Sequence, residues 1–585
     1  MKTYSLDTES TYETGRDIRS LGVANYVRHP ETDHYLVGLY SDDFAWVGHP
    51  KDAPWHLLAG NHVTMHNQSY DLQVVEELRR RGLAIPAFHH DCTADCAAFL
   101  QSPRSLADAG RELLGVELDK SVRDEMKGKR FEDQTPENKV RWGEYCLLDT
   151  KMTYHLWQHH SHKWPEHERG VSRHTAMIGA RGIGIDLSKV TQGIELLKQT
   201  VWEAEQEIPW AGELTAKGKD IPATSPLALA AECRRLGIEP PATTEEKSEI
   251  FQDWLDANAE RAPFVRAVGQ WRKANRLLKV LEAMQARTVE GRLRYSLKFF
   301  GAVATGRWSG DAGLNLQNLP RAPFCGVDAR GCLVPGPGKK LIVADLSQIE
   351  PRVLHWLTGN TRLLDMVRNG LPIYEAYSRV AMGWTGGSLK KENPALYQQA
   401  KVVVLGLGYG AGAAQFQRIA KVMGGLDLTE PESKRMVDQF RRANRQVVGL
   451  WDKLDRSLRD SWGGDFVMEL PSGRSIRYMG VAASGREITA RTELGGTRYR
   501  WWGSKLCENL CQATARDVFA DMVLRLEAAG LPVVLHCHDE AVLEVDENAA
   551  DDALRTTLEI MSTAPEWAEG LPVAAEAKVL DCYGK

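Results

Sequence analysis

Two aspartates lie beside apolar segments of the sequence. Asp345 ends the run LIVAD, and Asp539 lies inside the longer run LPVVLHCHDEAVLEV. A carboxylate next to buried strands is unfavourable unless something compensates its charge, and a divalent metal is a common compensation. If the two strands lie side by side, their aspartates can hold two Mg²⁺ ions about 4 Å apart, which activate an attacking hydroxyl and stabilise a leaving phosphate. Taken alone, either aspartate is better explained as an unrelated turn carboxylate.

A second segment with residues suited to chemistry is KVVVLGLGYG, which begins at Lys401. Lys401, Leu405 and Tyr409 are spaced four apart, so a helix places them on one face, where the lysine can bind a triphosphate and the tyrosine can pack at a base pair. A glycine-rich loop is the alternative, but the order of glycine and lysine excludes a P-loop. Each helical glycine costs about 1 kcal/mol relative to alanine, so the segment indicates a closely approaching neighbour or a moving helix. The glycines are Gly406, Gly408, Gly410 and Gly412.

Three pairs of polar residues near the N-terminus form a second constellation. Side chains that are two residues apart on a strand, or four residues apart on a helix, point to the same face. If the pairs converge, their four carboxylates are equipped for two-metal hydrolysis of a phosphodiester, with a tyrosine orienting the attacking water. Scattered surface acids are the alternative. The pairs are Asp7 with Glu9, Asn67 with Asp71, and Tyr145 with Asp149.

The C-terminal half contains the elements needed to position the first site. LIVAD predicts a buried strand, and a helix with Pro351 in its first turn is expected to follow it. A long helical region is expected over 361–460 and a further helix over 504–529. The apolar run around Asp539 predicts a β-hairpin with His538, Asp539 and Glu540 at its tip.

The N-terminal part predicts an α/β or α+β unit that closes near residue 168. Residues 3–7 alternate as in a strand, 32–49 read as hairpins, and 70–82 have helical periodicity. Residues 170–300 are expected to be mostly helical. Within them, 269–284 is an amphipathic basic segment, which is either an ordinary surface helix or one that follows a phosphate backbone.

Length and charge set the limits of these interpretations. The chain has 585 residues, a length that predicts about three to five structural units in an ordinary globular protein. Its net charge is −5. The charge does not indicate nucleic acid, but local basic patches are sufficient for phosphate binding. The first residues contain no apolar signal-peptide core, and no apolar run is long enough to span a bilayer. We therefore expect a soluble, cytoplasmic protein without membrane partners.

The ten cysteines are scattered along the chain. Cys92 and Cys96, with His89 and His90 beside them, raise the possibility of a zinc site, but buried free thiols are the commoner use of such residues and are the favoured interpretation. This usage fits a reducing compartment.

The motifs together resemble the family A DNA polymerases, the DNA polymerase I class. DLSQIEPR (345–352) resembles motif A, KVVVLGLGYG (401–410) motif B, and HDE (538–540) motif C. TGRW (305–308) with NLQNLP (315–320) resembles the primer-template-binding segment, and ENLCQATARD (508–517) the helix before motif C. All appear in family order, and GLGYGAG is similar to the phage branch.

The resemblance implies roles for individual residues. Asp345, Asp539 and the Leu346 carbonyl would bind two Mg²⁺ ions, for which Mn²⁺ can substitute. Lys401 would contact the nucleotide phosphates and act as a general acid for pyrophosphate, while Glu350 would exclude ribonucleotides. Further nucleotide contacts are assigned to Gln348, Leu405 and Tyr409. DNA contacts are assigned to Arg307, Asn315, Gln317, Gln512, His538 and Glu540.

Two positions depart from the family pattern. An arginine usually lies four residues before the motif B lysine, and here the residue is Tyr397, for which Lys390 or Lys391 is a candidate substitute. An aromatic residue usually lies four residues after that lysine, and here it is Leu405, which predicts discrimination against dideoxynucleotides.

The N-terminal pairs resemble the DEDDy class of 3′–5′ exonucleases, which precede the polymerase in this family. DxE, NxxYD and YxxxD occur in order, and SLADAGRELLGVELDKS (105–121) is similar to the same class. The resemblance implies that Asp7, Glu9, Asp71 and Asp149 bind two further Mg²⁺ ions, that Tyr145 is catalytic, and that proofreading is active. We expect no room for a 5′-nuclease domain.

The expected fold is therefore α/β and α+β multidomain, with an RNase H-like exonuclease followed by a right-hand polymerase. The expected function is template-directed DNA synthesis from dNTPs on primer-template DNA. We expect a monomeric enzyme that is encoded by a phage and acts in the cytoplasm of the host cell. One alternative is a nuclease or DNA-binding protein with an impaired polymerase half, and another is a single-subunit RNA polymerase, against which Glu350 argues. The expected domains are 1–168 (exonuclease) and 169–585 (polymerase), with the thumb at about 169–298, the palm at about 299–360 and 504–585, and the fingers at about 361–503.

Overall fold

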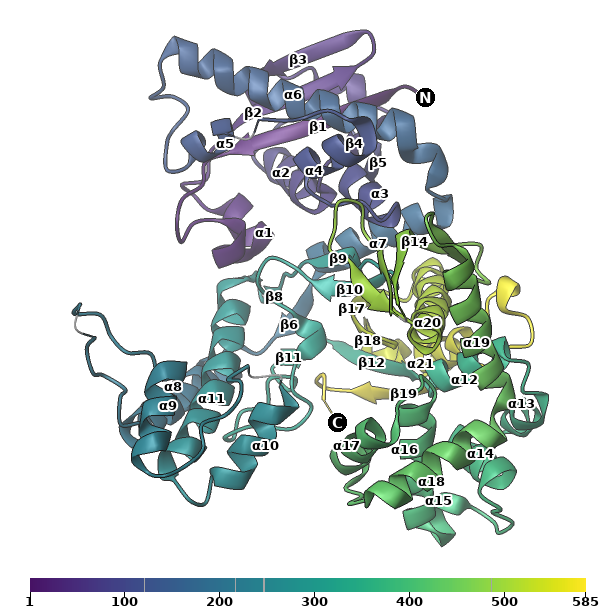
Figure 1. The fold of residues 1–585 in the computed structure, drawn as a ribbon. Coiled ribbons are helices and arrows are strands. Elements are labelled where there is room, and N and C mark those ends of the chain that lie inside the picture. The colour runs from purple at the N-terminus through teal and green to yellow at the C-terminus, as the bar shows by residue number, and fades with distance from the viewer. Residues whose placement is uncertain (120, 216, 246–247, 486, 585) are drawn as a thin grey trace.

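A computed structural model describes residues 1–119, 121–215, 217–245, 248–485 and 487–584. The chain folds into several α/β and α+β units, which confirms the expected fold class (Figure 1). In Figure 1 the N-terminal unit lies at the top, an antiparallel sheet lies in the middle, and helical units lie to its lower left and lower right. Over the described ranges, no helix has both the length and the apolar character needed to cross a bilayer.

The N-terminal unit is built on a five-stranded sheet in the order β3-β2-β1-β4-β5. Its central strand, β1, pairs antiparallel with β2 and parallel with β4. Tyr4 and Leu6 pack into the core on one face, so the alternation of the strand directs Asp7 and Glu9 to the other. The predicted strand, hairpin and helix are all confirmed. The elements are β1 (Thr3–Ser10), α1 (Ile18–Arg28), β2 (His34–Ser41), β3 (Phe44–Gly48), β4 (His62–Met65), α2 (Gln68–Arg80), β5 (His89–Cys92), α3 (Thr93–Phe99), α4 (Leu106–Ala109), α5 (Ser121–Met126) and α6 (Pro136–His160).

A helical unit follows, in which α8 and α11 pack side by side along their length. Gly193 permits this approach, because a Cβ there would lie 2.8 Å from Leu281 Cδ1. A separate small core at the tip is filled by Trp210, Phe251 and Phe264. The elements are α7 (Glu166–Arg181), β6 (Ile183–Ile185), α8 (Leu187–Glu207), α9 (Pro226–Arg235), α10 (Glu249–Asn258), α11 (Pro263–Ala286), β7 (Thr288–Val289) and β8 (Arg292–Leu293).

The predicted basic helix is the C-terminal two thirds of α11. Arg272 is not free for a ligand, because it donates to the Thr244 carbonyl at 2.6 Å and lies over the Phe251 ring. Lys273, Arg276 and Lys279 are exposed, three residues apart, and therefore share one solvent-facing side of the helix. This side is the part of the segment that remains suitable for phosphate contacts.

The central sheet has the order β17-β18-β12-β19, and all of its pairs are antiparallel. Leu341, Ile342, Val542 and Leu543 are fully buried, which explains the apolar runs seen in the sequence. The predicted strand, its following helix and the hairpin are confirmed. The elements are β9 (Leu297–Ala302), β10 (Arg307–Gly310), β11 (Leu333–Val334), β12 (Lys339–Leu346), α12 (Ile349–Leu357), α20 (Gly503–Ala528), β17 (Val533–Cys537), β18 (Glu540–Asp546), α21 (Ala550–Met561) and β19 (Ala575–Leu580).

Between α12 and α20 lies the predicted helical region. Local signals fix several helix starts: Asn393 caps α16 by accepting from the Leu396 amide, and Thr429 and Glu432 form a capping box on α18. The helices are α13 (Thr361–Arg368), α14 (Ile373–Ala381), α15 (Leu389–Glu392), α16 (Pro394–Leu407), α17 (Ala413–Gly424), α18 (Glu430–Ala443) and α19 (Arg445–Asp460).

A small sheet that the sequence did not predict follows α19 and contacts the N-terminal unit. The Gln101 side chain donates to the carbonyls of Arg477 and Thr492, and accepts from the Arg477 amide at 2.7 Å. Gln101 also accepts from the Leu494 amide through its backbone carbonyl. The strands are β13 (Phe466–Glu469), β14 (Ser475–Ser484), β15 (Glu487–Arg491) and β16 (Tyr499–Trp501).

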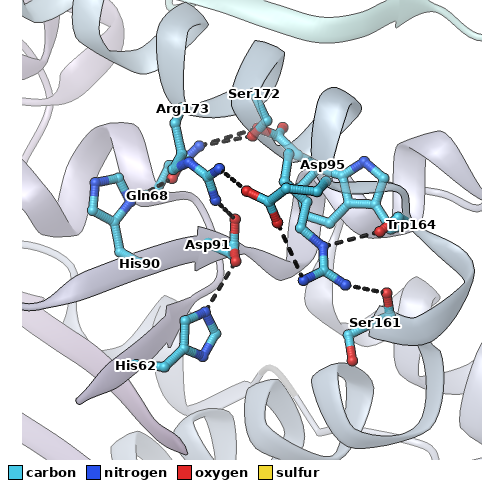
Figure 2. Close-up of polar contacts among 11 residues, drawn as sticks. His62, Gln68, His90, Asp91, Asp95, Ser161, Trp164, Ser172 and Arg173 are labelled. Atoms are coloured by element: carbon cyan, nitrogen blue, oxygen red, sulfur yellow. Dashed lines mark hydrogen bonds and ion pairs between the residues drawn. The ribbon is translucent and has the colours of Figure 1, made fainter. Parts of the chain in front are cut away.

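A network of buried polar side chains joins the N-terminal unit to α7 (Figure 2). Asp91 lies between His62, at 3.0 Å, and Arg173 of α7, at 2.7 Å. Asp95 accepts a hydrogen bond from Ser172 of α7 at 2.5 Å and pairs with Arg104. Because buried charges are stable only when paired, these contacts hold the two units in one arrangement.

A second buried network ties α7 to α20. Arg516 pairs with Glu168 of α7 at 2.6 Å and with Asp517 at 3.2 Å. Asp517 also pairs with Arg474, whose guanidinium donates to the Thr305 carbonyl at 3.1 Å. The primer-template-like segment TGRW is thereby attached to the helix that carries ENLCQATARD.

Two local expectations were wrong. Tyr409 was expected on the same helix as Lys401, but α16 ends at Leu407 because Gly410 adopts a left-handed φ of 82°, so Tyr409 lies in the turn that follows. Asn67 was expected inside a helix with Asp71, but it has φ 93° and precedes the first turn of α2. Of the expected domain limits, 168 falls inside α7 and 298 inside β9, whereas 361 and 503 coincide with helix starts.

Candidate active sites

Asp345 and Asp539 lie next to each other at one end of the central sheet. Asp345 is near the end of β12, and Asp539 lies in the turn between β17 and β18. Asp345 pairs in register with Glu540 of β18, and the Leu346 amide donates to the Asp539 carbonyl at 3.1 Å. The fold therefore brings together two acids that are far apart in the sequence.

The surroundings of Asp539 favour a bound cation. The pKa of the Asp539 carboxyl is raised to about 6. Burial is the largest cause and the nearby Glu350 carboxylate adds to it, whereas a backbone hydrogen bond and Arg307 oppose the rise. The protein therefore does not fully compensate the charge of this carboxylate. A divalent ion at Asp345 and Asp539 would compensate it, so the residues present fit a metal site.

The backbone adopts a left-handed conformation at one residue close to each aspartate. Gln348, three residues after Asp345, has φ 51°, and His538, immediately before Asp539, has φ 59°. For residues other than glycine such conformations cost about 1–3 kcal/mol and persist only where the surrounding structure imposes them. Burial lowers the pKa of the His538 imidazole, and Arg307 contributes, so a neutral side chain is favoured beside the site.

Glu540 is held by a residue that the sequence analysis missed. The Tyr583 hydroxyl donates to Glu540 Oε1 at 2.6 Å, and the Tyr583 ring is almost fully buried under the Arg330 guanidinium. The Tyr583 amide also donates to the Leu333 carbonyl at 2.8 Å, which fixes the segment after β19. No spacing or periodicity links Tyr583 to Glu540 in the sequence, because only the fold brings them together.

Glu350 links two other candidate residues. It forms an ion pair with Arg307 of β10, and its Oε2 accepts a hydrogen bond from the Tyr409 hydroxyl at 3.1 Å. Burial raises the pKa of Tyr409 well above its usual value, and Glu350 adds to this, so the hydroxyl keeps its proton and remains a donor. Arg307, Glu350 and Tyr409 thus form one cluster beside Asp539.

The segment that carries Lys401 approaches the acidic end of the sheet near both of its ends. Tyr397, one turn earlier on the same face, is close enough to Glu576 for that carboxylate to add to the effect of burial in raising the Tyr397 pKa. Glu576 of β19 pairs in register with Asp345. Beyond the other end of α16, Tyr409 contacts Glu350. Lys401 therefore lies between two points at which this segment meets the acids around Asp345.

Three of the four glycines of this segment, all except Gly412, are explained by close packing. A Cβ on Gly408 would lie 3.0 Å from Leu354 of α12, and a Cβ on Gly410 would lie 2.3 Å from the Ser504 hydroxyl of α20. Gly406 faces Ile419 at 3.0 Å. The expectation that something approaches the backbone closely is confirmed. Leu405 is half-buried and packs against the main core.

The residues expected to contact DNA gather in part around the hairpin. The Gln317 carbonyl accepts from Cys537 Sγ at 3.1 Å, next to His538, and Asn315 accepts from the Gln317 amide at 3.0 Å. Gln512 donates to Glu508 on its own helix at 3.3 Å. Arg307 joins the group through Glu350.

The N-terminal acids converge as the sequence predicts. Oxygens of Asp7, Glu9 and Asp149 lie within 4.8 Å of one another, and among the described residues this is the one group of three or more potential metal ligands that is so close. Asp71 accepts from the Thr8 hydroxyl at 2.8 Å, and burial together with the neighbouring Asp7 raises its pKa well above the usual value. Like charges so close are stable when a cation lies between them, so these residues also fit a metal site.

Tyr145 joins this group from α6. Burial raises its pKa, and the nearby Asp149 and Glu9 carboxylates add to the effect, so the hydroxyl stays protonated. Arg123 of α5, which the sequence analysis missed, lies close to the same groups: burial lowers the pKa of its guanidinium, but Tyr145 and Glu9 raise it and prevail. Arg123 is therefore a fixed positive charge beside the acids.

A second missed residue, Gly38, brings α6 to the sheet. Gly38 of β2 pairs in register with Asp7, and a Cβ at this position would lie 2.2 Å from the Thr150 hydroxyl of α6. Any other residue would push α6, with Asp149, away from Asp7. A lone glycine inside a strand run is the only sequence signal for such a close approach.

The cysteine interpretation is confirmed. Cys92 and Cys96 are buried free thiols, and burial raises the pKa of each to about 12. The neighbouring His90 is engaged by Gln68 at 3.0 Å. Both thiols therefore keep their protons in the core of the N-terminal unit.

The sequence and the fold are similar to those of known proteins. The family model for DNA polymerase family A matches residues 195–585, and the chain belongs to this family. DNA synthesis is accordingly the function of the class to which it belongs.

Individual relatives agree with this assignment. The DNA polymerase of Bacillus phage SP02 is 26% identical over the full length of both chains. The thermostable DNA polymerase I of Thermus filiformis is 28% identical over 72% of this chain, which spans 49% of that enzyme. The fold is similar to the POL domain of Pol1 from M. smegmatis, solved in complex with DNA primer-template and dNTP, with a TM-score of 0.71, 19% identity, and coverage of 99% of this chain and 95% of that one.

Proposed function

We propose that the protein extends DNA primers on a template, using dNTPs and two Mg²⁺ ions held by Asp345, Asp539 and the Leu346 carbonyl. The observation that carries this proposal is the juxtaposition of Asp345 and Asp539 at one end of the central sheet. When bound, Mg²⁺ lowers the pKa of the primer 3′-hydroxyl and neutralises charge on the triphosphate.

The remaining side chains position the reactants. Lys401 binds the phosphates and donates a proton from its Nζ to the departing pyrophosphate. Glu350, held by Arg307 and Tyr409, occupies the place of a ribose 2′-hydroxyl and so excludes ribonucleotides. The remaining nucleotide contacts are made by Gln348 and Leu405, and the primer-template is contacted by Arg307, Asn315, Gln317, Gln512, His538 and Glu540.

A second activity is proposed at the N-terminal acids, where Asp7, Glu9, Asp71 and Asp149 hold two metal ions and Tyr145 orients a water molecule. The close approach of three carboxylates and the nearby Arg123, whose charge suits a scissile phosphate, support 3′–5′ exonucleolytic proofreading. Within the whole chain, residues 1–168 form the exonuclease, and the thumb, palm and fingers occupy the segments given above. We further propose that the enzyme is a monomer that takes part in phage genome replication, and the similarity to a phage DNA polymerase supports the phage origin alone.

Primer extension separates the alternatives. A labelled primer-template is incubated with Mg²⁺ and either dNTPs or rNTPs, with the unmodified protein, Asp539→Ala and Asp7→Ala. We expect dNTP-dependent extension that is lost only in Asp539→Ala, and degradation that is lost only in Asp7→Ala. Efficient use of rNTPs would favour an RNA polymerase. Degradation without any extension by the unmodified protein would show an impaired polymerase half.

A further inference from the structure

A second lysine lies beside the face of α16 that carries Lys401. Lys390, on α15, places its Nζ 5.9 Å from the centre of the Tyr397 ring. Tyr397 is one helical turn before Lys401 and on the same face. The Lys390 side chain is exposed, and it makes no ion pair with any residue that the structure describes. Its charge is therefore available to a ligand.

Hydrogen bonds to a buried carboxylate fix the backbone next to Lys390. The buried carboxylate of Glu375 accepts from the Leu389 amide at 3.0 Å and from Arg379 at 2.7 Å. Arg379 also donates to the carbonyls of Gly386 and Gly387, and Leu389 itself is fully buried. The position of Lys390 is thus a property of the fold, whereas its flexible four-carbon side chain can still move.

The negative charge of a nucleotide explains why the position of Lys390 matters. A nucleoside triphosphate carries several negative charges, and one lysine compensates only part of them. Tyr397 supplies none, and it is close to the Glu576 carboxylate, which lies beside Asp345. The phosphates of a nucleotide bound by Lys401 and the Asp345 site would therefore pass near the Tyr397 ring, over which Lys390 lies.

We propose that Lys390 is a second phosphate-binding cation of the nucleotide site, held over Tyr397 in the free protein and contacting the triphosphate beside Lys401 when a dNTP binds. The inference rests on the proposed polymerase function. A weak, exposed cation–π contact is suited to this role, because a phosphate can displace it. Lys391, the next residue on the same helix, has no such contact with Tyr397 and is a matched control.

Nucleotide binding without chemistry provides the test. A dideoxy-terminated primer prevents extension, and a fluorescent base in the template reports formation of the complex with the next dNTP. We expect Lys390→Ala to raise the dNTP dissociation constant about five- to tenfold, the effect of losing one charge-assisted contact, and Lys391→Ala to change it less than about twofold. With an extendable primer, Lys390→Ala should raise KM by a similar factor and leave kcat within about twofold.

Rescue makes the test specific. Tyr397→Arg places a cation one turn before Lys401, so in the Lys390→Ala background it should restore dNTP binding to within about twofold of the unmodified protein. Equal dissociation constants for Lys390→Ala and Lys391→Ala, in a protein that extends primers, overturn the inference alone. A double variant that binds dNTP more weakly than Lys390→Ala also overturns it. An unmodified protein that extends no primer overturns the proposed function and the inference with it.

Discussion

At the scale of single residues, the site depends on side chains whose charge is set by their neighbours. Glu540 illustrates this, because its carboxylate lies beside Asp345 in the sheet and is oriented by the Tyr583 hydroxyl at 2.6 Å. A hydrogen bond to a charged group contributes about 1.5–3 kcal/mol. The position of Glu540, and through it the geometry around Asp539, is therefore sensitive to one oxygen atom of Tyr583.

Tyr583→Phe should weaken the polymerase site without unfolding the protein. The ring remains packed under Arg330, but Glu540 loses its donor, so we expect the Mg²⁺ concentration for half-maximal extension to rise about tenfold. The readout is extension rate against Mg²⁺ concentration. Tyr478→Phe removes a buried hydroxyl that accepts from Asn509, and should leave this Mg²⁺ dependence unchanged. An equal effect of the two variants would contradict the assigned role of Tyr583.

At the scale of elements, close packing of helices on sheets sets the geometry of both sites. Gly38 determines how near α6 comes to β1, and so how near Asp149 comes to Asp7. A displacement of about 1 Å at a catalytic group is enough to reduce a rate about a hundredfold. The N-terminal site should therefore respond to a single methyl group that lies outside it.

Gly38→Ala is expected to reduce exonuclease activity about a hundredfold while polymerase activity changes less than about twofold, because the added Cβ would lie 2.2 Å from the Thr150 hydroxyl. Degradation of single-stranded DNA and extension of a primer are measured on the same preparation. Gly449→Ala, whose Cβ meets open space in α19, is the control and should preserve both activities. Unchanged degradation by Gly38→Ala would show that α6 does not need this approach.

At the scale of the whole molecule, α7 connects the N-terminal unit to α20. His174 and Arg181 of α7 surround Glu527 of α20, and Glu527 also accepts from the Val533 amide at 2.9 Å. Although burial opposes it, these hydrogen bonds and the Arg181 charge lower the pKa of Glu527 to about 2. Ionised Glu527 thus stabilises the folded arrangement above the ordinary carboxyl pKa of 4.5.

Glu527→Gln should lower the free energy of unfolding by about 1–2 kcal/mol at pH 7, because the neutral side chain loses its charge interaction with Arg181, which solvent partly screens. Because the folded-state pKa is depressed, the difference between the two proteins should shrink as the pH falls from 4.5 towards 2. Denaturant unfolding across this range measures it. Asp552→Asn removes a fully solvated ion pair with Arg555 and should change stability by less than about 0.5 kcal/mol. A difference that persists undiminished to pH 3 would contradict the linkage.

Sequence reasoning was accurate where one segment determines its own structure. The apolar run before Asp345, the hairpin around Asp539 and the periodicity of α2 and α20 were all predicted, because burial and strand or helix period are local properties. The small sheet at 466–501 was not predicted, since buried and exposed residues alternate over only short stretches and the longest strand, β14, has a register shift between Met479 and Ala482.

Contacts between distant segments could not be predicted. Tyr583 with Glu540, Gly38 with Thr150, and Arg123 with the N-terminal acids depend on how whole elements pack. The end of α16 at Leu407 also depends on packing, because the left-handed Gly410 is required by the close approach of Ser504. Only the unusual density of glycines in this segment signalled such an approach in advance.

The most direct test of the two separate carboxylate sites uses a primer with a mismatched 3′ nucleotide, incubated with dNTPs and Mg²⁺. The unmodified protein should remove the mismatch and then extend the primer to the end of the template. Asp7→Ala should fail to remove the mismatch but should extend a matched primer, and Asp539→Ala should shorten the mismatched primer without extending it. Extension by Asp539→Ala, or removal of the mismatch by Asp7→Ala, would contradict the assignment of synthesis to Asp345 and Asp539 and of proofreading to the N-terminal acids.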